Sequence, residues 1–232
     1  MNQTQPSPLQ IGMLLYPDFT LLDLTGPQAV LGMHGKTHLL WKTLDAVSSD
    51  TGISLNPTTT FRDCPDDLDI LFVPGGMGTA QALEDPEILR FVANRAARAR
   101  YVTSVCSGSL ILGAAGLLRG YKSTSHWAVH ELLPMFGAEA VQARVVVDRN
   151  RISGGGVTAG IDFGLVLLAQ LRGEDAAKST QLMLEYDPQP PFDSGTPKTA
   201  EPHILKQVMG ILEPNNQQML RSAKAALRAT ST

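Results

Sequence analysis

The sequence predicts an α/β fold in which a mostly parallel sheet carries helices on both faces. Three observations predict it: short apolar runs of strand length recur along the chain, segments of helical period separate them, and glycine or proline marks the junctions. No internal repeat and no convincing linker interrupts residues 9–186. We therefore expect an N-terminal tail over residues 1–8 and one domain over residues 9–232 that ends in a helix.

The first elements follow this alternation. The run Leu9–Tyr16 has the length and composition of a buried strand. Gly26 and Pro27 predict a helix entrance, because the first helical turn does not use the N–H that proline lacks. Two more strands are expected over His38–Val47 and Leu68–Gly76, the latter stopped by Pro-Gly-Gly.

The later elements continue the pattern. A helix is expected over Asp85–Arg100, with Asp85 as its cap and Pro86 in its first turn. The remaining expected elements are a strand and small-residue helix at 101–118, a strand at 141–148, a strand, glycine turn and helix at 151–171, a helix at 173–186, a proline-rich loop at 187–202 and an amphipathic helix from about 203 onward.

Composition limits the possible partners. Nineteen Lys and Arg against 22 Asp and Glu give a net charge of −3, and no basic run stands out, so neither nucleic acid nor an anionic membrane is expected. No apolar stretch approaches the roughly 18 residues of a membrane span, and no secretory signal pattern is present. Cys64 and Cys106 are interpreted as reduced thiols. We expect a cytoplasmic protein that acts on a small molecule.

Cys106 lies where a predicted strand meets a predicted helix, in the stretch V-C-S-G-S. A helix N-terminus lowers the pKa of a thiol, and Gly108 permits the sharp turn of a nucleophile elbow. The alternative is a buried core cysteine. The polar and small neighbours Ser104, Ser107 and Ser109 favour the nucleophile, whereas Cys64 in a polar loop is interpreted as an ordinary thiol.

Gly75 and Gly76 end the neighbouring predicted strand at the same edge of the sheet. Their backbone N–H groups, together with that of Ser107, are candidates for an anion hole that stabilises developing negative charge. A plain turn that ends the strand explains the two glycines equally well, and the sequence leaves both interpretations open.

Six motifs together resemble the ThiJ/PfpI superfamily, most closely its isocyanide hydratase branch, over about residues 10–200: D-L-T-G-P, V-P-G-G, V-T-S-V-C-S-G-S-L-I-L-G-A-A-G-L-L, T-S-H-W, S-G-G-G-V-T-A-G-I-D and L-E-Y-D-P-Q-P-P-F. The resemblance implies a flavodoxin-like sandwich, usually a homodimer, with a reactive cysteine on a strained elbow beside an acid. Those roles fall on Cys106 and Asp23. Ser107 stands where that branch usually has threonine.

The chemistry that the resemblance implies is addition of water to an isocyanide. The Cys106 thiolate would attack the terminal carbon to give a covalent thioimidate, and Asp23 would deliver the proton and then assist water, releasing an N-substituted formamide. Burial and the nearby thiolate would have to raise the pKa of Asp23. By its position alone, Asp23 is better interpreted as a helix cap near Thr25 and Pro27, and the resemblance reverses this preference.

Other motifs are interpreted structurally. Ser107 replaces the histidine that follows the cysteine in the peptidase branch, which argues against proteolysis. His126 is expected at a helix start rather than in catalysis, and H-W-A-V-H lacks the zinc-binding H-E-x-x-H pattern. The late glycine-rich run is expected to line the pocket through Val157 and Thr158 rather than to bind a dinucleotide. Neither a metal nor a cofactor is expected.

Three points stay open. A glyoxalase or deglycase activity would use the same cysteine on α-oxoaldehydes, and a ligand or redox sensor would use the same fold without catalysis. Regulators of this superfamily carry a helix-turn-helix region, for which the residues after Pro202 are too few. The loop Tyr186–Phe192 either closes over the site or only joins elements.

Overall fold

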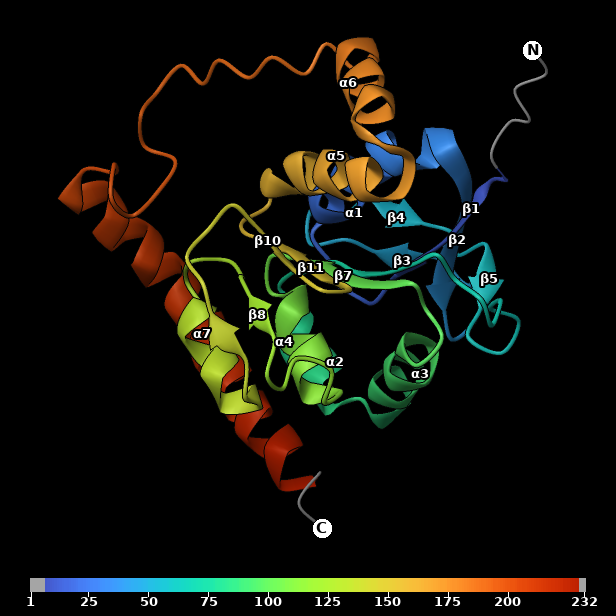
Figure 1. The fold of residues 1–232 in the computed structure, drawn as a ribbon. Coiled ribbons are helices and arrows are strands. Elements are labelled where there is room, and N and C mark those ends of the chain that lie inside the picture. The colour runs from blue at the N-terminus through green and yellow to red at the C-terminus, as the bar shows by residue number, and fades with distance from the viewer. Residues whose placement is uncertain (1–6, 230–232) are drawn as a thin grey trace.

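A seven-stranded sheet forms the centre of the chain in the computed structural model, which describes residues 7–229 (Figure 1). The strand order is β10-β11-β7-β6-β1-β2-β5, and every neighbouring pair is parallel except β10 and β11. The strands are β1 (Leu9–Leu14), β2 (Gly35–Trp41), β5 (Thr59–Thr60), β6 (Ile70–Val73), β7 (Tyr101–Val105), β10 (Val145–Asp148) and β11 (Arg151–Gly154). The predicted, mostly parallel sheet is confirmed.

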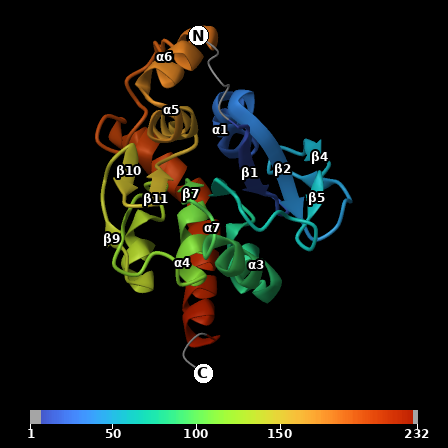
Figure 2. The same cartoon turned by 45° about the vertical axis from the view of Figure 1, so that its right-hand side comes forward.

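Helices cover both faces of the sheet, as predicted (Figures 1 and 2). On one face lie α1 (Leu21–Leu31) and α5 (Ala159–Arg172), followed by α6 (Glu174–Met183). On the other lie α2 (Thr79–Glu84), α3 (Pro86–Ala96) and α4 (Gly108–Ala114), with α7 (Pro202–Ala229) packed outside α2. The short elements are η1 (Gly32–His34), η2 (His130–Phe136), β3 (Val47–Ser48), β4 (Ser54–Leu55), β8 (Lys122–Ser123) and β9 (Glu139–Ala140).

The central strands are buried on both faces, which is why their sequences are continuous apolar runs. All four residues of β6 are buried, as are the last four of β7 and five of the six in β1. The amphipathic helix α3 shows the other pattern and buries only one face. Asp85 caps it by accepting hydrogen bonds from the N–H groups of Glu87 and Ile88, as the sequence predicts.

The predicted helix entrance at Gly26 and Pro27 is wrong. Helix α1 begins six residues earlier, at Leu21, and Pro27 lies inside it. The proline packs against α5 at a glycine: a Cβ at Gly160 would lie 2.9 Å from Cδ of Pro27. This contact joins residues more than 130 positions apart, so no local pattern reveals it.

Several element boundaries also differ from the predictions. The second strand runs over Gly35–Trp41 rather than His38–Val47, because it pairs along the whole of β1, from Gly35 opposite Leu9 to Leu40 opposite Leu14. A turn follows Ser125 where the sequence suggests a helix, and its continuation, η2, is a 3₁₀ helix that contains Pro134. Residues 1–6 of the expected N-terminal tail lie outside the described residues. Within residues 7–229, no helix is both long and apolar enough to cross a membrane.

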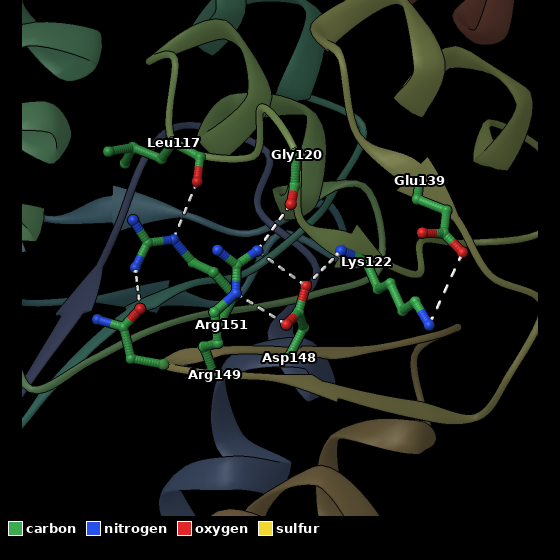
Figure 3. Close-up of polar contacts among 8 residues, drawn as sticks. Leu117, Gly120, Lys122, Glu139, Asp148, Arg149 and Arg151 are labelled. Carbon is green, nitrogen blue, oxygen red and sulfur yellow. Dashed lines mark hydrogen bonds and ion pairs between the residues drawn. The ribbon is translucent and has the colours of Figure 1, made fainter.

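A polar cluster at the β10–β11 hairpin fixes the segment that leads toward the site (Figure 3). Asp148 accepts hydrogen bonds from the N–H of Lys122 at 2.8 Å and from Nε of Arg149 at 3.0 Å. Arg149 and Arg151 donate in turn to the carbonyl oxygens of Gly120 and Leu117. The hairpin therefore holds residues 117–122, and the chain continues from there directly into the residues that support Cys106.

Candidate active site

The carboxyl ends of β1, β6 and β7 bring the predicted catalytic residues together. The strand order reverses between β1 and β6, since the chain passes from β1 outward to β2 and then returns to β6 on the other side. Such a switch point is the usual ligand site of an open α/β sheet. Asp23 follows β1, Gly75 follows β6 and Cys106 follows β7, so all three meet at this edge.

Cys106 occupies a strained turn. Its φ is +57°, in the left-handed region that favours glycine. Its N–H donates to the carbonyl oxygen of Gly155 at 2.7 Å, and its own carbonyl accepts from Oγ of Ser125 at 2.9 Å. Gly108 permits the turn, because a Cβ there would lie 2.3 Å from the carbonyl oxygen of Val73. The elbow that the sequence suggests is therefore present, and backbone contacts on both sides hold it.

Asp23 is fully buried and has a specific orientation. Its Oδ2 accepts a hydrogen bond from the N–H of Gly75 at 2.9 Å. Within residues 7–229, Oδ1 has no N–H or O–H partner, and the carboxyl interacts with the Cys106 thiol. Burial raises the pKa of Asp23 to about 7, although the hydrogen bonds from Gly75 and Cys106 act in the opposite direction. Near neutral pH this carboxyl can therefore both donate and accept a proton.

The Cys106 thiol is not the low-pKa thiol that its position at a helix N-terminus suggests. Burial raises its pKa well above the ordinary value, and the charge of Asp23 raises it further. The N–H and hydroxyl of Ser107 lower the pKa by hydrogen bonding to the sulfur, but burial outweighs them. Burial therefore opposes the effect of the helix terminus on this thiol, and the resting pair of Cys106 and Asp23 retains a proton.

The N–H groups of the two predicted anion-hole glycines donate hydrogen bonds to side chains and are not free to bind a substrate anion. The N–H of Gly75 donates to Asp23, and the N–H of Gly76 donates to Oγ of Ser107 at 3.1 Å. Of the three amides proposed from the sequence, that of Ser107 interacts with the sulfur. Gly75 must remain glycine, because a Cβ there would lie 2.6 Å from the Ser107 nitrogen and 2.8 Å from Cβ of Cys106.

A cavity of about 920 Å³ lies beside the elbow. His126, Val157 and Thr158 line it, whereas Cys106 and Asp23 do not. Ser125 and Gly155 form the wall between the two, since both line the cavity and both bond to the backbone of Cys106. One layer of backbone thus separates the cavity from the nucleophile.

His126 lies in the turn after Ser125, where it lines the cavity. Its Nδ1 accepts from the N–H of Ala128 at 3.3 Å, which places its proton on Nε2, and burial lowers its pKa. A Cβ at Gly156 would lie 3.3 Å from Cδ2 of His126, so the ring packs on the glycine-rich turn. The imidazole is part of the wall, and its bonds do not connect it to Cys106.

The loop Tyr186–Phe192 does not line the cavity. Tyr186 donates to Oδ2 of Asp162 at 3.0 Å, which also pairs with Arg144, and Phe192 is exposed. The next part of the same loop, residues 195–198, does line the cavity, together with one face of α7. The proline-rich segment therefore contributes to the site beyond the residues that the sequence singled out.

Tyr16 and Thr79 are site residues that sequence reasoning missed. The Tyr16 hydroxyl lies 3.2 Å from Oγ1 of Thr79, which lies 2.8 Å from Oγ of Ser107. All three side chains are buried. Tyr16 and Thr79 belong to separate segments 63 residues apart, and neither stands in a motif that would have marked it.

Comparisons with known proteins agree with this architecture. Residues 10–170 match the DJ-1/PfpI family. The chain is 55% identical over 201 residues to an isonitrile hydratase of Pseudomonas putida, covering 86% of this chain and 88% of that protein. It is also 32% identical over 108 residues to a deglycase of Pyrococcus horikoshii, covering 46% of this chain and 65% of that protein.

The solved structures confirm the fold. The crystal structure of a ThiJ/PfpI family protein from Pseudomonas syringae superimposes with a TM-score of 0.93 at 50% sequence identity, covering 96% of this chain and 94% of that one. The flavodoxin-like arrangement that the motifs imply is therefore correct over nearly the whole chain.

Proposed function

The chain belongs to the DJ-1/PfpI family, and we propose that it hydrates isonitriles, R–N≡C, to N-substituted formamides through a covalent intermediate on Cys106. The observation that carries this proposal is the pairing of a cysteine held at φ +57° with a buried carboxyl whose pKa is about 7. One group supplies a nucleophile and the other supplies a proton at neutral pH. Those are the two requirements of the reaction.

The first half of the reaction uses the proton that the pair holds. The thiol proton of Cys106 passes to Asp23 as the sulfur forms a bond to the terminal carbon of the isonitrile. Asp23 then gives this proton to the same carbon. The product is a thioimidate, R–N=CH–S–Cys106, and Asp23 is left as a carboxylate.

The second half consumes water. Asp23 accepts a proton from the water that attacks the thioimidate carbon and passes it to the nitrogen, giving a tetrahedral adduct. When the second water proton leaves the new hydroxyl, the C–S bond breaks and the formamide, R–NH–CHO, departs. The N–H of Ser107 stabilises the departing sulfur, which then regains a proton through Asp23. One water hydrogen ends on nitrogen, the other on sulfur, and the original thiol hydrogen on carbon.

We propose that the cavity beside the elbow receives the R group. Its volume of about 920 Å³ lies within the range of small-molecule sites. Its lining is more apolar than polar, with Val157 and Trp127 among the apolar residues and Glu131, Arg144, Lys198 and Glu213 among the charged ones. His126 and Thr158 add polar edges. An uncharged, largely hydrocarbon substituent suits the apolar part of this lining. Because the backbone of Gly155 and Ser125 lies between the cavity and the sulfur, this proposal requires that wall to move when the substrate binds.

The test measures both product and intermediate. Purified protein is mixed with cyclohexyl isocyanide, formamide is quantified by NMR, and the quenched protein is digested for mass spectrometry. We expect an adduct on the Cys106 peptide and a loss of at least about 100-fold in kcat for Cys106→Ala and Asp23→Asn, whereas Cys64→Ser retains activity. Near wild-type turnover by either of the first two variants contradicts the assigned role.

A deglycase or glyoxalase activity is the second candidate, because the deglycase of Pyrococcus horikoshii is also similar to this chain. The same sulfur could add to the aldehyde carbon of an α-oxoaldehyde. Parallel assays with methylglyoxal and cyclohexyl isocyanide separate the two, and we expect the isonitrile to be the better substrate by kcat/KM. A redox sensor is disfavoured, because a buried thiol with a raised pKa oxidises slowly.

We further propose that the protein is a cytoplasmic homodimer. Both cysteines are unpaired, as is usual in a reducing compartment. Large apolar side chains are exposed at the end of α6, in the following loop and on the first half of α7: Leu182, Met183, Phe192, Met209 and Ile211. A second copy of the chain is the occupant that the family resemblance implies for such a surface. Light scattering after size exclusion should give twice the 24.9 kDa chain mass, and a monomer mass contradicts the proposal.

A further inference from the structure

Three buried hydroxyl groups form a continuous chain that ends beside the sulfur of Cys106. The Tyr16 hydroxyl donates to the carbonyl oxygen of Pro74 at 2.8 Å. It also contacts Thr79, which in turn contacts Ser107. None of the three side chains is more than 3% exposed, so solvent cannot substitute for a missing partner.

The direction of these hydrogen bonds follows from the number of protons available. A hydroxyl group has one proton, and that of Tyr16 is already given to Pro74. Thr79 must therefore donate to the Tyr16 oxygen, which leaves Ser107 to donate to Thr79. Oγ of Ser107 completes its bonding by accepting from the N–H of Gly76. In this arrangement no hydroxyl proton points at the sulfur.

A second arrangement uses the same atoms. The Ser107 hydroxyl also adjoins the Cys106 side chain, since a Cβ at Gly75 would lie 2.7 Å from Oγ of Ser107 and 2.8 Å from Cβ of Cys106, and this hydroxyl lowers the pKa of the thiol. Its single proton cannot serve Thr79 and the sulfur at once. When Ser107 turns its proton to the sulfur, Thr79 can turn its own proton to Ser107. We propose that Tyr16, Thr79 and Ser107 form a reversible hydroxyl relay that points away from Cys106 while it is a thiol and toward it when it is a thiolate.

The two arrangements contain the same number of hydroxyl hydrogen bonds. They also use the same heavy atoms, so reversal requires only that the hydroxyl protons rotate. Only the 3.2 Å bond from Thr79 to Tyr16 is lost. The bond gained, from Ser107 to an ionised sulfur, is charge-assisted and therefore stronger than a neutral one. Ser107 thus stabilises negative sulfur only at the stages of the reaction when it exists. Tyr16 and Thr79 are positioning residues that hold the Ser107 proton away from the sulfur while it is a thiol.

The inference rests on the proposed function for its role in turnover, but its test does not use an isonitrile. The reaction of Cys106 with iodoacetamide depends on the thiolate, so its rate against pH reports ionisation of the sulfur. Asp23 faces the sulfur from α1, and Tyr16 lies at the end of the relay farthest from the sulfur. Asp50 acts electrostatically on Asp23 and on Tyr16. These groups are unchanged in Thr79→Val, which isolates the relay.

Thr79→Val and Tyr16→Phe each remove more bonds from the thiol arrangement than from the thiolate arrangement. Without Thr79, the thiol form loses two hydrogen bonds and the thiolate form loses one. Without the Tyr16 hydroxyl, the bond from Thr79 is lost in the thiol form alone. We therefore expect both variants to shift the alkylation profile of Cys106 toward lower pH by about half to one unit, the equivalent of one net hydrogen bond.

The experiment uses the full chain with Cys64→Ser, so that mass spectrometry follows one thiol. Thr79→Ser keeps the hydroxyl and should titrate like the parent. Thr103→Val is the matched control, because Thr103 is also buried but its hydroxyl donates to Leu71 outside the relay. Unshifted profiles for folded Thr79→Val and Tyr16→Phe, or an equal shift in Thr103→Val, overturn the relay. Failure to form formamide, with these shifts present, instead overturns the proposed function.

Discussion

Replacing Asp23 by asparagine should remove activity and yet stabilise the fold at neutral and alkaline pH. The carboxyl is fully buried, its pKa is about 7 in the folded protein, and an ordinary aspartate ionises near 3.8. The folded protein therefore holds this proton more tightly than the unfolded chain does. As a result, the contribution of Asp23 to stability is greatest below pH 4 and is lost as pH rises toward 7.

The size of the effect follows from that difference of about three pKa units. Each unit corresponds to about 1.4 kcal/mol, so ionised Asp23 destabilises the fold by about 4 kcal/mol above pH 7. Asparagine has no such charge and keeps the oxygen that accepts from Gly75. Its amide protons lack a strong acceptor, which costs about 1 to 3 kcal/mol at every pH. Only the charge contribution varies with pH.

The decisive quantity is therefore how the stability difference between Asp23→Asn and wild type changes with pH. We expect it to move in favour of the variant by about 2 to 3 kcal/mol between pH 5 and pH 8, as measured by urea unfolding under reducing conditions. Asp187→Asn, at an exposed carboxylate, is the control and should show no such change. A pH-independent difference for Asp23→Asn refutes the assignment of a raised pKa.

Three further predictions concern the elbow and its surroundings. Gly75→Ala should lower kcat by about 100-fold or more through the clash with the Ser107 backbone, whereas Gly210→Ala, with open space around it, should leave formamide production unchanged. Cys106→Gly should have a free energy of unfolding in urea about 1 kcal/mol higher than that of Cys106→Ala, because only glycine adopts a φ of +57° without strain. Equal free energies of unfolding argue against strain at this position. Asp85→Ala should cost about 1 to 2 kcal/mol of stability by removing the α3 cap while kcat is unchanged, and Asp85→Asn should lose less.

The features that the sequence predicts are those that local chemistry determines. The run after Tyr101 is continuously apolar because β7 is central, and the cysteine follows at the point where glycine and serine begin a helix. Asp85 and Pro86 begin α3 for reasons contained in four consecutive residues. Asp23 is identified only through the order of the family motifs, since its sequence position alone favours a helix cap.

The features that escaped prediction depend on distant contacts. Pro27 lies inside α1 and packs on the distant Gly160, and Thr79 reaches Ser107 only once β6 and β7 are paired. The pKa of Cys106 is a third case. A helix start is visible in the sequence and favours the thiolate, but the burial that outweighs it is a property of the assembled core.

The raised pKa of Cys106 suits an isonitrile better than a low one would. The substrate is neutral, and its terminal carbon must gain both a sulfur and a proton. A thiolate fully ionised by a helix terminus would bring no proton of its own, so the proton would have to rest on Asp23. Burial of Cys106 beside Asp23 disfavours two negative charges, so the pair retains a proton at neutral pH. The same burial that slows oxidation of the thiol therefore keeps one proton on the pair formed by Cys106 and Asp23, ready for transfer to the substrate.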